Sequence, residues 1–171
     1  MIEFYTIRIG KDMKILMVCL GNICRSPMAQ GILEQKVLNK KLDWYVDSAG
    51  TSGWHNGEPP DVRAMKSAKS RGINISQQTS RKITPSDLEK FDVILAMDSS
   101  NYQEILKMSL NRQQKEKIHL ILNFHLPGRN VSVPDPYYDG KFDEVYDLLD
   151  LALDDFIKCM TEKVTGKMIS S

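Results

Sequence analysis

The residues best suited to chemistry stand close together near the N-terminus. Cys19 is followed by five residues, then by Arg25 and the hydroxyl of Ser26. A cysteine thiolate is a strong nucleophile, and the planar guanidinium of arginine can hold two oxygens of a phosphate group at once. Ser26 could donate a hydrogen bond to the sulfur, which would stabilise the thiolate as attacking group and later as leaving group. The spacing predicts attack by Cys19 on an oxyanion bound by Arg25.

The elements around Cys19 are those that bind anions in α/β proteins. Residues 14–20 form a continuous apolar run, typical of a strand buried on both faces. A helix is expected over residues 26–41, and its N-terminal N–H groups and dipole attract negative charge. Gly21 and Asn22 tolerate the left-handed backbone that lets successive loop amides point inward. The loop after the first strand is therefore predicted to bind phosphate and to favour the thiolate form of Cys19.

Strand and helix patterns alternate along the whole chain. This alternation predicts a single-domain α/β fold in which a four-stranded parallel sheet is flanked by helices. The expected strands are residues 14–20, 44–47, 92–97 and 118–124. The expected helices begin with Ser26 at a capping position, with Pro59-Pro60-Asp61, with Thr84-Pro85-Ser86-Asp87, after a Ser99 cap, and with the apolar stripe that starts at Phe142. Residues 127–141 are expected to be a long loop.

Composition and charge exclude several classes of function. The chain has 171 residues, 42% of them hydrophobic, and a formal net charge of +1, which indicates one globular domain and no affinity for nucleic acid or a membrane. It lacks a signal-peptide core and any apolar stretch of membrane-spanning length. Three cysteines cannot build a disulfide framework. The few cysteines therefore indicate a reducing, cytoplasmic compartment. No cluster has metal-ligand spacing, so we predict neither a metal nor a cofactor.

One family resemblance covers most of the chain. The phosphate loop of the low-molecular-weight protein tyrosine phosphatases is similar to the segment Val18-Cys19-Leu20-Gly21-Asn22-Ile23-Cys24-Arg25-Ser26-Pro27. Further matches follow in family order: Asp47-Ser48-Ala49-Gly50-Thr51, Pro59-Pro60-Asp61, Ala96-Met97-Asp98 with Asn101, and Asp135-Pro136-Tyr137-Tyr138. The resemblance implies a phosphatase domain over residues 13–165, an N-terminal extension or alternative start over residues 1–12, and a tail over residues 166–171.

The resemblance implies hydrolysis of phosphotyrosine and small aryl phosphates through a phosphocysteine intermediate. Cys19 would be the nucleophile, Arg25 would hold the phosphate, and Asp135 would be the general acid and base. An acid is needed because the leaving phenolate has a conjugate acid with a pKa of about 10. The partners would be phosphotyrosine proteins or peptides, and phosphate or sulfate is expected to bind in the loop.

The remaining site residues surround these three. Phosphate binding and support of the loop are assigned to Leu20, Gly21, Asn22, Ile23, Cys24, Ser26 and Ser48. Tyr137 and Tyr138 are expected to form the walls of a slot for an aromatic ring, and Trp54 its rim. Cys24 is expected to protect Cys19 from irreversible oxidation by forming a disulfide with it.

One position departs from the family, and three alternative functions remain open. Gln78 stands where many members have a histidine that steadies Asn22 and Ser48, and we expect Gln78 to replace its hydrogen bonds without titrating. The alternatives are an arsenate reductase, a phosphoarginine phosphatase and an inactive phosphopeptide-binding module. The lack of further cysteines between Cys24 and Cys159 argues against the first, and the apolar side chain of Ile23 argues against the second. The third is disfavoured because Cys19, Arg25, Ser26 and Asp135 are all present.

Overall fold

The computed structural model describes residues 12–169, with side chains described as far as residue 162. The predicted N-terminal extension therefore lies outside the described residues, except for Asp12. Of the predicted tail, only the backbone of residues 166–169 is described, as the end of the last helix.

Four parallel strands form one sheet in the order β2-β1-β3-β4. The strands are β1 (Lys14–Cys19), β2 (Tyr45–Gly50), β3 (Val93–Ala96) and β4 (Ile118–Leu120). The central strand β1 pairs with both neighbours, so that Ile15 lies opposite Val46 on one side and Val93 on the other. The predicted fold class is confirmed. Because β2 and β3 lie on opposite sides of β1, the carboxyl edge between β1 and β3 is the switch point where such sheets bind ligands.

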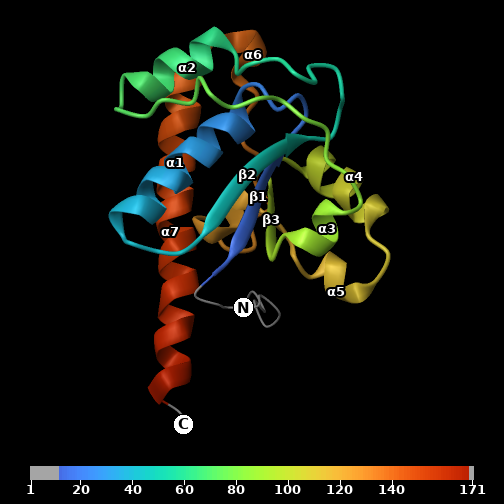
Figure 1. The fold of residues 1–171 in the computed structure, drawn as a ribbon, viewed down its shortest axis with the longest axis vertical. Coiled ribbons are helices and arrows are strands. Elements are labelled where there is room, and N and C mark those ends of the chain that lie inside the picture. The colour runs from blue at the N-terminus through green and yellow to red at the C-terminus, as the bar shows by residue number, and fades with distance from the viewer. Residues whose placement is uncertain (1–11, 170–171) are drawn as a thin grey trace.

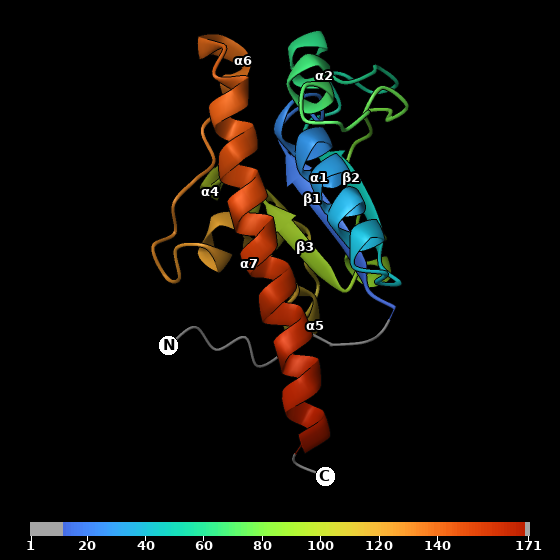
Figure 2. The ribbon, with the colours of Figure 1, turned by 90° about the vertical axis from the view of Figure 1, so that its left-hand side faces the viewer.

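Helices cover both faces of the sheet (Figures 1 and 2). α1 and α7 pack on one face, and α3 and α4 lie on the other. In both views α2 and α6 lie at the end of the molecule toward which β1 points. The elements are α1 (Arg25–Asn39), α2 (Val62–Lys69), α3 (Asp87–Lys90), α4 (Ser99–Met108), α5 (Arg112–Lys115), the 3₁₀ helix η1 (Ile121–Phe124), α6 (Pro136–Asp139) and α7 (Phe142–Ile169).

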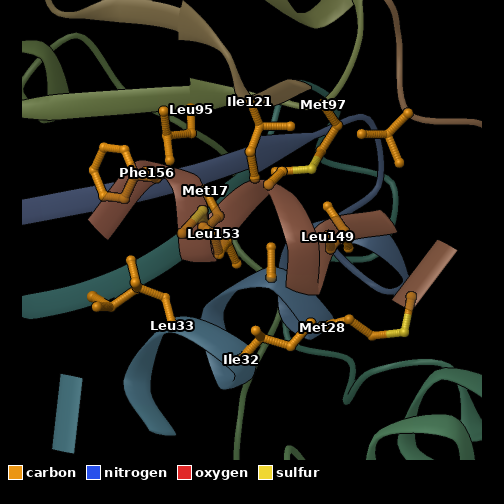
Figure 3. Close-up of a cluster of buried hydrophobic side chains, with 14 of the residues drawn as sticks. Met17, Met28, Ile32, Leu33, Leu95, Met97, Ile121, Leu149, Leu153 and Phe156 are labelled. Carbon is orange, nitrogen blue, oxygen red and sulfur yellow. The ribbon is translucent and has the colours of Figure 1, made fainter. Parts of the chain in front are cut away.

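Alternate residues of β1 enter two separate hydrophobic clusters. Met17 points into the larger cluster, between α1 and α7, whereas Leu16 and Val18 belong to the smaller one beside α3 and α4. Figure 3 shows the larger cluster, with Met28, Ile32 and Leu33 from α1, Leu149, Leu153 and Phe156 from α7, Leu95 from β3, Met97 just after β3, and Ile121 from η1. Burial of a large apolar side chain contributes about 1.5–3 kcal/mol. Apolar packing on both faces of the sheet therefore holds β1 in place, and with it the position of Cys19 at the end of the strand.

Three predicted strands are shorter than expected and one is longer: the strand expected over residues 92–97 is Val93–Ala96, and the strand expected over residues 44–47 is Tyr45–Gly50. The first ends at Cys19, and Leu20 already belongs to the following loop, where it is 38% exposed. The expected strand over residues 118–124 ends at Leu120 and continues as η1. The side chains of η1 pack against α7, and an apolar run alone does not distinguish a strand from a helical turn. The expected loop over residues 127–141 contains the short helix α6, and α5 was not predicted.

Two predicted helix caps are wrong. Ser26 lies inside α1, whose N-cap is Cys24, and its hydroxyl contacts the Cys19 sulfur instead. Ser99 is the first residue of α4, and the cap is Asp98, whose carboxylate accepts from the Asn101 N–H at 2.7 Å. Ser26, which does not cap α1, and Asp98, which caps α4, both lie at the carboxyl edge of the sheet.

Candidate functional site

The segment from Cys19 to Ser26, called here the Cys19 loop, connects β1 with α1 at the switch point of the sheet. The Cys19 sulfur lies 3.0 Å from Ser26 Oγ and accepts from the Asn22 N–H at 3.2 Å. Ser26 Oγ itself accepts from the Asn22 side chain at 2.8 Å, so the hydroxyl proton is available to the sulfur. Two donors therefore converge on the sulfur, an arrangement that stabilises negative charge on it.

Asn22 holds the shape of the Cys19 loop. Its φ of 54° lies in the left-handed region, which a non-glycine residue adopts only when its surroundings fix it. The side-chain nitrogen donates to Ser48 Oγ at 2.9 Å as well as to Ser26, and the side-chain oxygen accepts from the Arg81 N–H at 3.0 Å. Ser48 then donates to Gln30 Oε1 at 2.7 Å. Neutral groups thus support the loop from behind.

Gln78 does not take the place that the sequence predicted for it. Its Nε2 donates to the carbonyl of Pro27 at 3.1 Å, and its Oε1 is buried without a hydrogen-bond partner. Ser48 instead donates to the side-chain oxygen of Gln30. The expectation that Gln78 replaces the hydrogen bonds of the family's histidine to Asn22 and Ser48 is therefore wrong.

Arg25 is fixed by three groups from distant parts of the chain. Its side chain is only 4% exposed; Nη1 donates to Asp98 Oδ2 at 2.8 Å and to the carbonyl of Val133 at 3.1 Å, and Nη2 lies 3.5 Å from Asp135 Oδ2. Burial alone would lower the pKa of Arg25, but the neighbouring Cys19 and Asp98 raise it above its usual value. Arg25 therefore stays charged and points in one direction.

Asp98 is a residue at the site that the sequence analysis did not assign. It belongs to a matched segment and lies two residues after the end of β3, close to the carboxyl end of the strand, as Cys19 ends β1. Since β1 and β3 are neighbours, a carboxylate at the end of β3 reaches the same edge as the Cys19 loop. A position shortly after a buried strand becomes a usable signal only once that strand is known to lie beside β1.

Asp135 reaches the site from the opposite side. It caps α6, with Oδ1 accepting from the Tyr137 N–H at 3.1 Å, and this leaves Oδ2 directed toward Arg25. Its side chain is 35% exposed, so solvent can reach the carboxylate. Tyr137 and Tyr138 follow, with ring centroids 5.1 Å apart and the ring planes at 78°.

A cavity of about 170 Å³ joins the predicted catalytic and pocket residues. Asn22, Ser26 and Ser48 are not among its lining residues, and they support the Cys19 loop from behind. His55 also lines the cavity and was missed by the sequence analysis, because a polar loop residue carries no positional pattern. The lining residues are Cys19, Leu20, Gly21, Ile23, Cys24, Arg25, Trp54, His55, Asp135, Tyr137 and Tyr138.

His55 lies directly over the Cys19 loop. Its Nδ1 is 2.7 Å from Glu58 Oε2, which orients the ring. A Cβ placed on Gly21 would come within 3.2 Å of the His55 ring, so glycine at this position lets the imidazole approach the loop backbone.

Among the described residues, no group of three or more histidine, cysteine, aspartate or glutamate side chains is placed to hold a metal ion. Among the helices of residues 12–169, none combines the length and the apolar character needed to cross a membrane.

Comparison with known proteins gives consistent results. A family model described as low molecular weight phosphotyrosine protein phosphatase matches residues 14–166. The human low molecular weight phosphotyrosine protein phosphatase is 41% identical over 137 residues, which cover 77% of this chain and 85% of the human protein. The crystal structure of a protein tyrosine phosphatase from Entamoeba histolytica, with Hepes in its active site, is 40% identical with a TM-score of 0.82 and covers 88% of this chain and 98% of that one. A Drosophila arginine phosphatase is 36% identical with a TM-score of 0.79 and covers 85% of this chain and 96% of that one.

Proposed function

Because this chain belongs to the low molecular weight phosphotyrosine protein phosphatase family, we propose that it hydrolyses phosphotyrosine in proteins or peptides, and small aryl phosphates, through a phosphocysteine intermediate. One observation carries the proposal: Cys19, Arg25 and Asp135 line one cavity, although Asp135 is far from the other two in sequence. A nucleophile, a phosphate-binding cation and a proton donor are the groups this reaction needs.

In the first step the phosphoryl oxygens accept hydrogen bonds from the amides of the Cys19 loop and from Arg25. The Cys19 thiolate attacks phosphorus, so that the S–P bond forms as the P–O bond to the phenol breaks. Asp135 gives its proton to the departing oxygen, which leaves as a neutral phenol. Because Asp135 Oδ2 lies 3.5 Å from Arg25, the acid is beside the bound phosphoryl group.

In the second step the Asp135 carboxylate takes a proton from water. The water oxygen forms a bond to phosphorus as the S–P bond breaks, inorganic phosphate leaves, and the Cys19 thiolate is restored. Ser26 and the Asn22 N–H stabilise the sulfur as it departs, because they are its hydrogen-bond partners.

The aromatic side chains suit a substrate ring near the mouth of the cavity. Tyr138 is 88% exposed and Trp54 is 75% exposed, which is far from a core position for either residue. Tyr137 is 43% exposed and lines the same cavity. A phenyl ring entering between these side chains would gain apolar contact while its phosphate reaches the Cys19 loop.

The similarity to an arginine phosphatase makes phosphoarginine the second candidate substrate. The cavity favours an aromatic ring over a guanidinium, because Ile23 offers no hydrogen-bond acceptor in its side chain. Arsenate reduction would need further cysteines on a mobile loop in the second half of the chain, but none lies between Cys24 and Cys159, and Cys159 is on α7, outside the cavity lining. A module without catalysis would not need Asp135.

Hydrolysis of phenyl phosphate and of a phosphotyrosine peptide without added metal tests the proposal. We expect turnover of both, with kcat/KM at least about tenfold above that for phosphoarginine, in line with the discrimination one pocket contact supplies. Arsenate reduction with a thiol reductant, assayed in parallel, should stay at background. A preference for phosphoarginine, or activity with arsenate alone, would contradict it.

We also propose redox protection of the nucleophile, and a cytoplasmic location that keeps it reduced. Cys24 is 5% exposed and lines the cavity with Cys19. Burial, and then the nearby Asp61 and Cys19, raise the pKa of Cys24 well above its ordinary value. Cys24 therefore stays a protonated thiol while peroxide oxidises Cys19 to a sulfenic acid. The two condense to a disulfide with loss of water, which a thiol reductant reverses.

Cys24→Ser is expected to lose most of the recovery of activity after peroxide treatment. The variant has no thiol beside Cys19, so its sulfenic acid proceeds to sulfinic acid. Peroxide-treated protein is incubated with a reductant, its remaining activity is measured, and linked cysteines are identified by mass spectrometry. The wild type should recover and show a Cys19–Cys24 linkage. Full recovery by the variant, or a linkage to Cys159, would exclude this role.

The domain boundaries stay a proposal as well. We propose residues 13–165 as the phosphatase domain, with residues 1–12 as an extension or alternative start and residues 166–171 as a tail. The family match over residues 14–166 supports the main boundary.

A further inference from the structure

Arg63 connects the two segments that carry the proposed catalytic groups. Its Nε and Nη2 donate to the Asp61 carboxylate at 3.0 and 2.9 Å, and its Nη1 donates to the carbonyl of Tyr137 at 3.0 Å. Asp61 is attached to the Cys19 loop, because its backbone N–H donates to the carbonyl of Ile23 at 2.8 Å. One guanidinium thus joins the Cys19 loop, through Asp61, to the first turn of α6.

The backbone of Tyr137 is also what orients Asp135. The Tyr137 N–H donates to Asp135 Oδ1 at 3.1 Å, while the carbonyl of the same residue accepts from Arg63. With Oδ1 engaged in this way, Oδ2 is the oxygen directed toward Arg25. A displacement of Tyr137 would therefore move the carboxylate that has to meet the leaving oxygen.

Two aromatic rings contact the Arg63 guanidinium. Its central carbon lies 5.3 Å from the centroid of the Tyr137 ring and 4.7 Å from that of Phe142. Phe142 is buried at the start of α7 and gives this contact a fixed base. A lysine could not bind Asp61 in this bidentate way, reach the Tyr137 carbonyl and contact both rings at once, because it lacks the planar fork.

The segment around Asp135 is held at one further place. Before Asp135, the Val133 N–H donates to the carbonyl of Met97 at 2.7 Å, and the Val133 carbonyl accepts from Arg25. After Asp135, the carbonyl of Tyr137 is held by the hydrogen bond from Arg63. α6 has only four residues, too few to form a stable helix without such support.

We propose that Arg63 is a positioning residue for Asp135, which keeps the carboxylate in reach of the leaving oxygen by holding the Tyr137 backbone. The inference rests on the proposed role of Asp135 as general acid. Arg63 does not line the cavity, so it acts through Asp135 rather than on the substrate. Proton transfer needs hydrogen-bond contact, and a displacement of about 1 Å is enough to slow it strongly.

Arg63→Ala should make kcat/KM more sensitive to the leaving group. With phenyl phosphate, which needs the acid, we expect a loss of about tenfold; with an aryl phosphate whose phenol is acidic, the loss should stay under about twofold. In an Asp135→Asn background Arg63→Ala should cause no further loss, because its effect passes through the missing acid. Equal losses across the leaving groups, or additive losses in the double variant, would overturn the positioning role.

Arg71→Ala is the matched control. Arg71 also connects the region of α2 to α7, through Asp143, Asp147 and the ring of Tyr146, but has no contact with α6 among its described interactions. Loss of this arginine should leave kcat/KM within about twofold for both leaving groups. A control as impaired as Arg63→Ala would show that any weakening of α7 packing suffices, which contradicts a specific role.

Hydrogen exchange measured without substrate separates the two proposals. The amides of residue 135 and of residues 137–141 should exchange faster in Arg63→Ala than in wild type, and at the wild-type rate in Arg71→Ala. A wild-type chain without activity on aryl phosphates would overturn the proposed function, and the positioning role with it. An active wild type whose Arg63→Ala variant keeps its exchange rates would overturn the positioning role alone.

Discussion

Replacement of Cys19 by serine is expected to lower the hydrolysis of aryl phosphates by roughly 10⁴- to 10⁶-fold, the scale seen when a catalytic nucleophile is removed. The reason is electrostatic as much as chemical. The sulfur lies between the Asn22 N–H and Ser26 Oγ, which stabilise a negative atom, whereas a serine hydroxyl keeps its proton and attacks poorly. Phosphate release from phenyl phosphate, followed over hours, gives the residual rate.

Binding of inorganic phosphate distinguishes loss of the nucleophile from loss of the fold. Arg25 and the loop amides are unchanged in Cys19→Ser, so calorimetric titration should give a dissociation constant close to that of wild type. Cys159→Ser is the matched control, since Cys159 lies on α7, outside the cavity lining, and this variant should keep wild-type activity. In wild type, rapid acid quenching should trap one phosphoryl group on Cys19.

Two outcomes would contradict the nucleophile assignment. Substantial turnover by Cys19→Ser would show that another group attacks phosphorus. Trapping of the phosphoryl group on a residue other than Cys19 would do the same, whatever the rate of the variant.

Features set by local sequence were predictable. The spacing of Cys19 and Arg25, the apolar run before them and the helix after them identify the loop, because one strand end and one helix start decide its shape. The parallel sheet followed from the alternation of patterns. Asp135 was found because two prolines bracket it and because its segment resembles the family.

Contacts between residues that are distant in sequence could not be predicted from local patterns, because they depend on which elements become neighbours in the fold. Asp98 binds Arg25 across 73 positions of sequence, and its role appears only once β3 is known to lie beside β1. Arg63 reaches Tyr137 across 74 positions through a backbone carbonyl, which no residue type reveals.

Gln30, which supports the Cys19 loop from behind, could have been identified from its position in the sequence. Gln30 follows Ser26 by one helical turn, so both lie on the same face of α1. That face points toward Ser48, and Gln30 makes the hydrogen bond there that the sequence analysis expected of Gln78. Helical spacing would have favoured Gln30, because it depends on one element rather than on the path of a loop.

Replacement of Asp135 by asparagine is expected to lower kcat/KM for phenyl phosphate by about 10²- to 10⁴-fold, the usual contribution of general acid catalysis. The substitution keeps the shape of the site, because an asparagine oxygen can still accept from the Tyr137 N–H and cap α6. What it removes is the proton. kcat/KM reports the steps up to release of the phenol, so it isolates protonation of the leaving group from hydrolysis of the phosphocysteine.

The leaving-group dependence decides the role of Asp135. A phenol with a low pKa departs without a proton, so the loss for such a substrate should be far smaller than for phenyl phosphate. Asp139→Asn is the matched control: Asp139 ends the same short helix and caps only the Lys141 N–H, so both substrates should react at nearly the wild-type rate. If Asp135→Asn lowers kcat/KM equally for every leaving group, Asp135 holds Arg25 or the loop in place and another group supplies the proton.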